Sequence, residues 1–143
     1  MTQQTNFSSK LRPALPKFER ANVLSFVERT VLAEYGQCRN LNSDQISSYQ
    51  AVRGLIAACI CYITDFQPPD KQSWTYVHEM LRAGLDDTTF ALADESGLKA
   101  VFTDVPKNAY CRQLFESSLA GDKNHGSVVL GKSLRAIVNY IYR

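Results

Sequence analysis

Hydrophobic residues recur at the spacing of an α-helix in several segments of the chain, with short polar stretches between them. Residues 17–35 form the first such segment, and Gly36 follows them as a helix stop signal. The apolar stripe of this segment consists of Leu24, Val27, Val31 and Tyr35. Residues 1–16 lack the periodicity and contain Pro13 and Pro16, so we expect a flexible or extended arm ahead of the first helix.

The most apolar segment lies between residues 43 and 66. Asn42 or Ser43 is suited to cap its start, and a pair of prolines follows its end. Its middle, AVRGLIAACICYI, carries Arg53 as its only charge, so a helix here would be buried on most of its sides. A strand is the alternative interpretation of LIAACICYI, but the length of the segment and its alanines favour a helix. We therefore predict a central helix.

Two helical segments follow the prolines. The first covers residues 70–84, and its inner stripe consists of Trp74, Val77, His78 and Leu81. Residues 85–95 are polar and acidic with a few apolar anchors, so we expect a loop or a short helical turn. Ser96 can cap the second segment, a short helix over residues 97–102.

The last third of the chain predicts two more helices. The first restarts at residues 104–106, with Pro106 near its first turn, and continues to Gly121. Its stripe consists of Cys111, Leu114, Phe115 and Leu119. After a polar loop, the final helix covers residues 127–142. Its inner stripe consists of Leu130, Leu134, Ile137, Val138 and Ile141, with Lys132, Arg135, Asn139 and Arg143 facing outward.

Length and composition agree with one helical domain. A chain of 143 residues fits a single domain and can build its core without disulfides or metals. The longest apolar run, residues 55–63, is far shorter than the ~20 residues that a membrane-spanning helix needs. We predict an all-α fold, in which residues 17–143 form a single bundle of about five main helices with short loops.

A metal site is not predicted, because the cysteines have the wrong spacing. Cys59 and Cys61 lie two residues apart in a predicted helix, which turns them about 200° from each other. His78 and His125 have no partner at the spacing of metal ligands. The polar N-terminus has no secretory signal, so we expect a cytoplasmic protein with reduced, free thiols.

The sequence from Gly126 to Ser133, GSVVLGKS, satisfies the phosphate-loop pattern GxxxxGK[ST]. That motif needs a strand before it and a helix after it, so that backbone N–H groups wrap the phosphates. The preceding residues are polar, and only ten residues follow Ser133, so neither the strand nor a metal-binding acidic residue has a place. We therefore interpret this stretch as the start of the last helix, and predict no bound nucleotide or other cofactor.

Catalytic residues are likewise not predicted. The chain has no GxSxG motif and no Cys/His pair that its spacing makes a nucleophile and base. The acidic pairs Asp86-Asp87 and Asp94-Glu95 are typical of solvated loop charge. We expect that the chain is not an enzyme by itself. A conserved cluster of carboxylates and histidine among homologues would revive the enzyme hypothesis.

Charge is distributed unevenly, although the net charge is only +2. Residues 54–104 carry three basic and eight acidic residues, whereas residues 105–143 carry six basic and two acidic ones. The candidate contacts with DNA or a protein partner are Lys107, Arg112, Lys123, Lys132, Arg135 and Arg143. The low net charge argues against strong non-specific binding to nucleic acid, and a solvated surface of mixed sign is the alternative interpretation.

From Ala51 onward the succession of segments resembles a known domain. It consists of AVRGLIAACICYITDFQPPDKQSWTYVHEMLRAG, then SGLKAVFTDVPKNAYCRQLFESSLAG, then SVVLGKSLRAIVNYI. In the order and spacing of these segments, the chain resembles the all-α domain of conjugative coupling proteins, the TraG/TraD-type ATPases of type IV secretion systems. The matching positions are Leu55, Ile56, Tyr62, Ile63, Pro69, Gln72, Trp74, Val77, Leu81, Ser96, Leu98, Phe102, Pro106, Ala109, Tyr110, Phe115, Gly131, Lys132, Ser133 and Leu134.

The resemblance implies a function in conjugative DNA transfer. In that family the all-α domain sits on the motor and engages relaxase, accessory proteins and DNA, within a membrane-anchored complex. Family members also carry a motor domain and membrane helices, and this chain contains neither. The resemblance therefore implies a substrate-recognition domain without ATP hydrolysis, either excised or stand-alone. The alternative is a cytoplasmic helical adaptor or regulator that binds a protein partner and has no link to DNA.

Overall fold

The computed structural model describes residues 14–16, 20–33, 43–88, 97–119 and 126–142. Its helical elements are η1 (Arg20–Asn22), α2 (Val23–Arg29), α3 (Ser43–Phe66), η3 (Pro69–Lys71), α4 (Trp74–Thr88), α5 (Gly97–Thr103), α6 (Tyr110–Leu119) and α7 (Gly126–Tyr142). The described residues contain no strand, only an isolated bridge between Ala14 and Ser73. The predicted all-α helical bundle is confirmed, and the strand interpretation of LIAACICYI is wrong.

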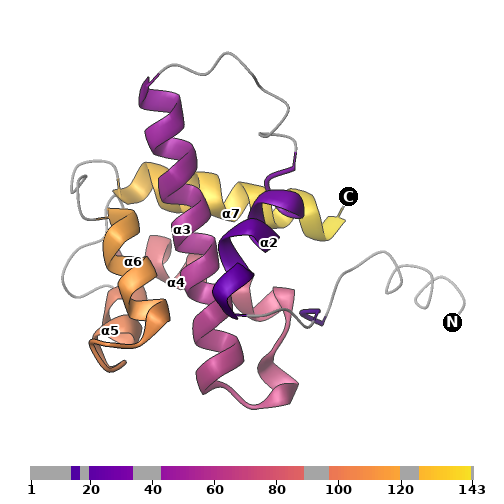
Figure 1. Ribbon diagram of the computed structural model, residues 1–143, viewed down its shortest axis with the longest axis vertical. Coiled ribbons are helices and arrows are strands. Elements are labelled where there is room, and N and C mark those ends of the chain that lie inside the picture. The colour runs from indigo at the N-terminus through magenta and orange to yellow at the C-terminus, as the bar shows by residue number, and fades with distance from the viewer. Residues whose placement is uncertain (1–13, 17–19, 34–42, 89–96, 120–125, 143) are drawn as a thin grey trace, which may run out of the picture.

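Helix α3 is the axis of the molecule, as the sequence predicts (Figure 1). It packs against α2, α4, α6 and α7. Every residue from Gly54 to Cys61 is buried, and Ile63 continues the buried region toward the end of the helix. Fully burying one large aliphatic side chain contributes roughly 1.5–3 kcal/mol, so this helix supplies much of the hydrophobic stabilisation.

Local hydrogen bonds fix the turn between α3 and α4. The Gln72 side-chain amide donates to the carbonyl oxygen of Gln67 at 3.0 Å, next to the two prolines that end α3. The Ser73 hydroxyl then accepts the backbone N–H of Tyr76 at 3.2 Å. This is the N-cap arrangement that satisfies a free donor in the first turn of a helix. The sequence from Gln72 to Ser73 thereby sets where α4 begins.

Three predicted boundaries are wrong. Helix α4 continues past Gly84 to Thr88, because a glycine costs a helix only about 1 kcal/mol and does not by itself end it. Helix α6 begins at Tyr110, since residues 104–109 form a separate turn in which the N–H of Ala109 donates to Pro106. Helix α2 ends at Arg29, because residues 30–33 form turns in which the N–H of Leu32 donates to the carbonyl of Val27, five residues back.

The buried face of α7 is rotated from the predicted stripe. Leu134 and Val138 are only half-buried. The buried positions are Val129, Ser133, Ala136, Ile137, Tyr140 and Ile141. Hydrophobicity alone places a serine on the outside of a helix. Because α7 lies against both α3 and α4, small residues such as Ser133 and Ala136 fit on its buried face. Similar shifts affect α2, where Val23 is buried and Leu24 half-buried, and α4, where Met80 is buried and His78 half-buried.

Aromatic rings join the helices at two places. Trp74 of α4 stacks with Phe26 of α2 at 6.1 Å between centroids and meets Tyr140 of α7 edge-on at 4.9 Å. Phe102 of α5 stacks with Phe115 of α6 at 4.3 Å and contacts Tyr62 of α3 edge-on at 5.8 Å. Each ring pair adds about 0.5–1.5 kcal/mol beyond its buried area, so the two clusters hold the outer helices to α3 and α4.

The end of the predicted N-terminal arm is attached to the bundle. The N–H of Leu15 donates to the carbonyl of Gln72 at 3.2 Å, and the Leu15 side chain packs on the core. Residues 1–13 lie outside the described part of the chain. Within the arm, Ala14–Pro16 is therefore an extended segment in contact with the start of α4.

Two helical glycines give a matched test of this packing. A Cβ at Gly54 would lie 3.1 Å from Cβ of Ser118, whereas a Cβ at Gly131 would meet no atom within 4 Å. We predict that Gly131→Ala raises the free energy of unfolding by about 0.5–1 kcal/mol, as glycine-to-alanine does in open helix positions. Gly54→Ala should lower it by about 1 kcal/mol, because Ser118 and the α6 backbone that carries it must shift by a few tenths of an ångström. Urea unfolding of both variants measures this, and an equal stabilisation by both would contradict the close α3–α6 contact.

Candidate partner surface on helix α7

One side of α7 faces away from the bundle and carries the residues that remain accessible. The outer face of α7 consists of Gly131, Lys132, Leu134, Arg135, Val138, Asn139 and Tyr142. Gly131, Arg135, Val138 and Tyr142 form its centre, because they follow one another at intervals of three or four residues. Lys132, Arg135, Asn139 and Tyr142 are exposed, and the other three are half-buried.

The outer face of α7 is positively charged. The sequence of α7 contains Lys132 and Arg135 but no Asp or Glu, so the helix itself offers these cations no counter-charge. Lys132 donates from Nζ to the Ser48 hydroxyl of α3 at 2.9 Å, which orients its side chain along the surface. Tyr142 is 63% exposed, although its ring is large and mostly apolar. Two of the predicted contact residues thus share one surface with an accessible aromatic ring.

The other predicted contact residues do not join this surface as a group. Arg112 of α6 is occupied: its guanidinium donates to the carbonyls of Thr103 at 3.2 Å and Val105 at 2.8 Å. A further ion pair links Arg112 to Glu116 at 3.8 Å on the same helix. Lys107 lies exposed in the turn before α6. Lys123 and Arg143 lie outside the described residues.

The phosphate-loop pattern from Gly126 to Ser133 lies entirely within α7. A continuous helix directs its backbone N–H groups along its axis, so this stretch does not form the loop that wraps phosphates. Ser133 is completely buried, and its hydroxyl has no hydrogen-bond partner in the structure. The hydroxyl that would bind the metal ion in a phosphate loop therefore points into the core.

The described cysteines lie in the core and form no disulfide bond with one another. Cys59, Cys61 and Cys111 are fully buried. Burial, and to a lesser extent the neighbouring Cys111, raises the pKa of the Cys59 thiol well above its usual value. Among the residues that the structure describes, no three His, Cys, Asp or Glu side chains gather to hold a metal ion. No helix in the same ranges is both long and apolar enough to cross a membrane.

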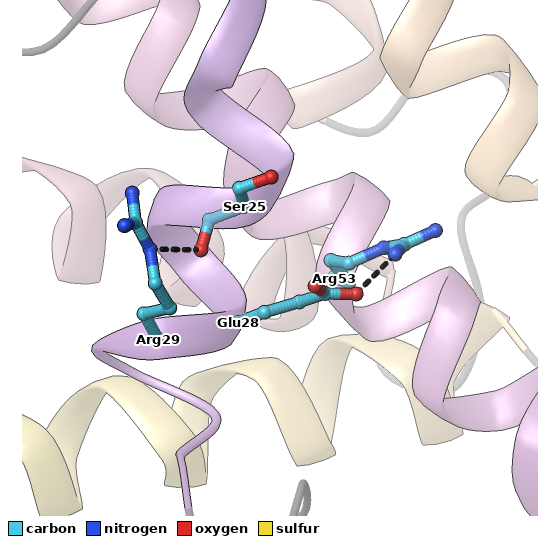
Figure 2. A network of polar contacts seen from close by, with 4 residues as sticks. All are labelled: Ser25, Glu28, Arg29 and Arg53. Atoms are coloured by element: carbon cyan, nitrogen blue, oxygen red, sulfur yellow. Dashed lines mark hydrogen bonds and ion pairs between the residues drawn. The ribbon is translucent and has the colours of Figure 1, made fainter.

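A polar network between α2 and α3 was missed by the sequence analysis. Figure 2 shows Glu28 of α2 pointing to Arg53 of α3, with which it forms an ion pair, whereas Arg29 bonds the carbonyl of Ser25. Burial and the Glu28 carboxylate raise the pKa of the nearby Tyr49. The signal was present, because Arg53 is the only charge in the apolar segment and a charge there requires a partner. Its partner could not be named without the packing of α2 on α3.

Comparison with known proteins yields no relative. No protein family, no curated protein and no solved structure matches the chain.

We predict that Arg112→Ala destabilises the turn between α5 and α6. Removing the guanidinium leaves the carbonyls of Thr103 and Val105 without this donor, and hydrogen bonds from a charged group contribute about 1.5–3 kcal/mol each at most. The free energy of unfolding should fall by about 1–2 kcal/mol, with faster amide exchange in α5. An unchanged stability, together with weaker partner binding, would instead place Arg112 on the contact surface.

The buried thiols should resist alkylation in the folded protein. Because the raised pKa keeps Cys59 protonated at pH 8, its reactive thiolate is scarce, and burial also excludes the reagent. Iodoacetamide labelling read by peptide mass spectrometry should leave Cys59, Cys61 and Cys111 unmodified until denaturant is added. Rapid labelling of Cys59 under native conditions would contradict its burial.

Proposed function

We propose that this chain is a substrate-recognition domain of conjugative DNA transfer, non-catalytic by itself, which engages relaxosome protein or DNA. The observation that carries the proposal is the outer face of α7, where Lys132, Arg135 and an exposed Tyr142 share one side of a helix without acidic residues. Cations that contact phosphates and aromatic rings that stack on bases are the groups that single-stranded nucleic acid requires. The same groups are enriched where proteins bind proteins.

The resemblance of residues 51–143 to the all-α domain of coupling proteins supplies the biological setting. An all-α bundle is the architecture that this resemblance implies, and the folded chain has it. In this proposal the domain works in the cytoplasm beside a motor that another polypeptide or segment provides. The basic C-terminal third approaches the transfer substrate, and α3 holds α7 in place.

A stand-alone helical adaptor is the second candidate. The observation that favours it is the half-buried apolar part of the outer face, Leu134 and Val138, which suits a protein partner better than a phosphate backbone. The neighbouring genes discriminate the two candidates. Relaxase and secretion-channel genes nearby favour the first candidate, and their absence favours the adaptor.

The direct test is a salt-titrated binding assay against short single- and double-stranded DNA and against purified relaxase and accessory proteins. We predict binding that weakens with salt, and that is reduced in the double variant Lys132→Ala/Arg135→Ala. For double-stranded DNA, losing two phosphate contacts should reduce the slope of log affinity against log salt by about 2. Removing these exposed side chains should leave the thermal unfolding midpoint nearly unchanged.

The matched control is Lys71→Ala/Arg82→Ala, which removes the same two charges from exposed positions on η3 and α4. This control should bind as the wild type does. If it loses as much affinity as the α7 variant, the effect is one of net charge and not of the outer face. If the wild-type chain binds neither the DNA nor the relaxosome proteins at low salt, the proposed function is wrong.

A further inference from the structure

We propose that the outer face of α7 is a docking site for an acidic amphipathic helix of a partner protein. This inference deepens the proposed function and rests on it in one respect, since both use the outer face of α7 as the contact surface. It adds the chemistry of the partner: apolar side chains on one stripe of a helix, with carboxylates beside them.

The centre of the outer face combines apolar positions with open space for an incoming side chain. Tyr142 is the most exposed of the large hydrophobic side chains in the described chain, and the half-buried Val138 lies one turn before it. Gly131, two turns before Val138, leaves open space, because a Cβ there would meet no atom within 4 Å. An incoming side chain can therefore approach the helix backbone at Gly131 and pack toward Val138 and Tyr142. Recognition of one helix by another uses anchors at this spacing.

Charge complementarity selects an acidic partner. Arg135 lies in the centre of the face and Lys132 at its edge, and α7 contributes no carboxylate to offset either. A helix that places Glu or Asp beside its apolar stripe would pair with both cations as it docks. A second copy of the chain docked through the same face would bring like charges together, so self-association by α7 is disfavoured.

The balance between charge and apolar area favours protein over nucleic acid. Nucleic-acid binding gains most of its affinity from many phosphate contacts, whereas this face offers two cations on a chain of net charge +2. Val138 and Leu134 gain nothing from phosphates, but they gain from burial under an apolar stripe. Apolar side chains beside an arginine and a tyrosine are usual at protein–protein interfaces, where both of these residue types are enriched among the anchors.

The test uses the full 143-residue chain and a synthetic helical peptide with Leu at positions i, i+4 and i+7 flanked by Glu. Two matched peptides serve as controls, one with every Glu replaced by Gln and one with the same composition scrambled. A single-stranded DNA oligonucleotide is the fourth probe. We expect the acidic amphipathic peptide to bind roughly tenfold more tightly than either control peptide, because two ion pairs and the stripe are both required.

Two variants locate the binding. Arg135→Glu should abolish the preference for Glu over Gln, while Lys71→Glu, the same charge reversal on η3, should retain it. Gly131→Leu fills the open space and should weaken peptide binding severalfold without lowering the thermal unfolding midpoint, since the site has room for a side chain. This variant separates a blocked surface from a damaged fold.

The outcomes separate this inference from the proposed function. Binding of single-stranded DNA that depends on Arg135, without binding of the acidic peptide, overturns the inference and leaves the proposed function standing. Peptide binding that depends on Arg135 and Gly131, in a chain that ignores relaxosome proteins and DNA, upholds the inference and removes the proposed function. Equal binding of the acidic and scrambled peptides overturns the inference, because charge alone would then account for it.

Discussion

Burial of the middle of α3 on all its sides is the constraint on which the rest of the structure depends. A helix with an unbroken buried run from Gly54 to Cys61 must be covered by other helices, and α2, α4, α6 and α7 supply that cover. Gly54 allows α6 to approach closely, and the ion pair from Glu28 accommodates Arg53, the half-buried charge immediately before the run. The outer helices therefore lie where they cover the apolar surface of α3.

That constraint also gives α7 two different faces, one buried and one accessible. Its inner face packs in the core through side chains between Val129 and Ile141. Even Ser133 is buried on this face, and its hydroxyl has no hydrogen-bond partner. Its outer face carries two cations, an exposed tyrosine and a glycine with open space beside it. Packing of the core does not explain why these residues lie on one accessible face. Residues that do not pack in the core and that gather on one face are the best candidates for contact with a partner.

The sequence was sufficient to predict the elements, but not their rotations or polar contacts. The bounds of α3 and α7 were predicted closely, because strong periodicity and flanking stop signals mark them. The buried face of α7 was misplaced, since the fit of Ser133 and Ala136 depends on neighbouring helices. The hydrogen bonds of Arg112 were also not predicted, because its acceptor carbonyls come from a turn whose geometry no side-chain pattern reveals.

The most direct test of this account is native-state hydrogen exchange, which reports the free energy of opening for each backbone amide. If α3 is the element on which the structure depends, amides 55–63 exchange only when the whole domain unfolds, and their opening free energy equals that from denaturant unfolding. Amides in α5, which packs mainly against α4 and α6, should open at lower free energy. If α3 opens locally while α7 stays protected, α3 is not the axis of the fold.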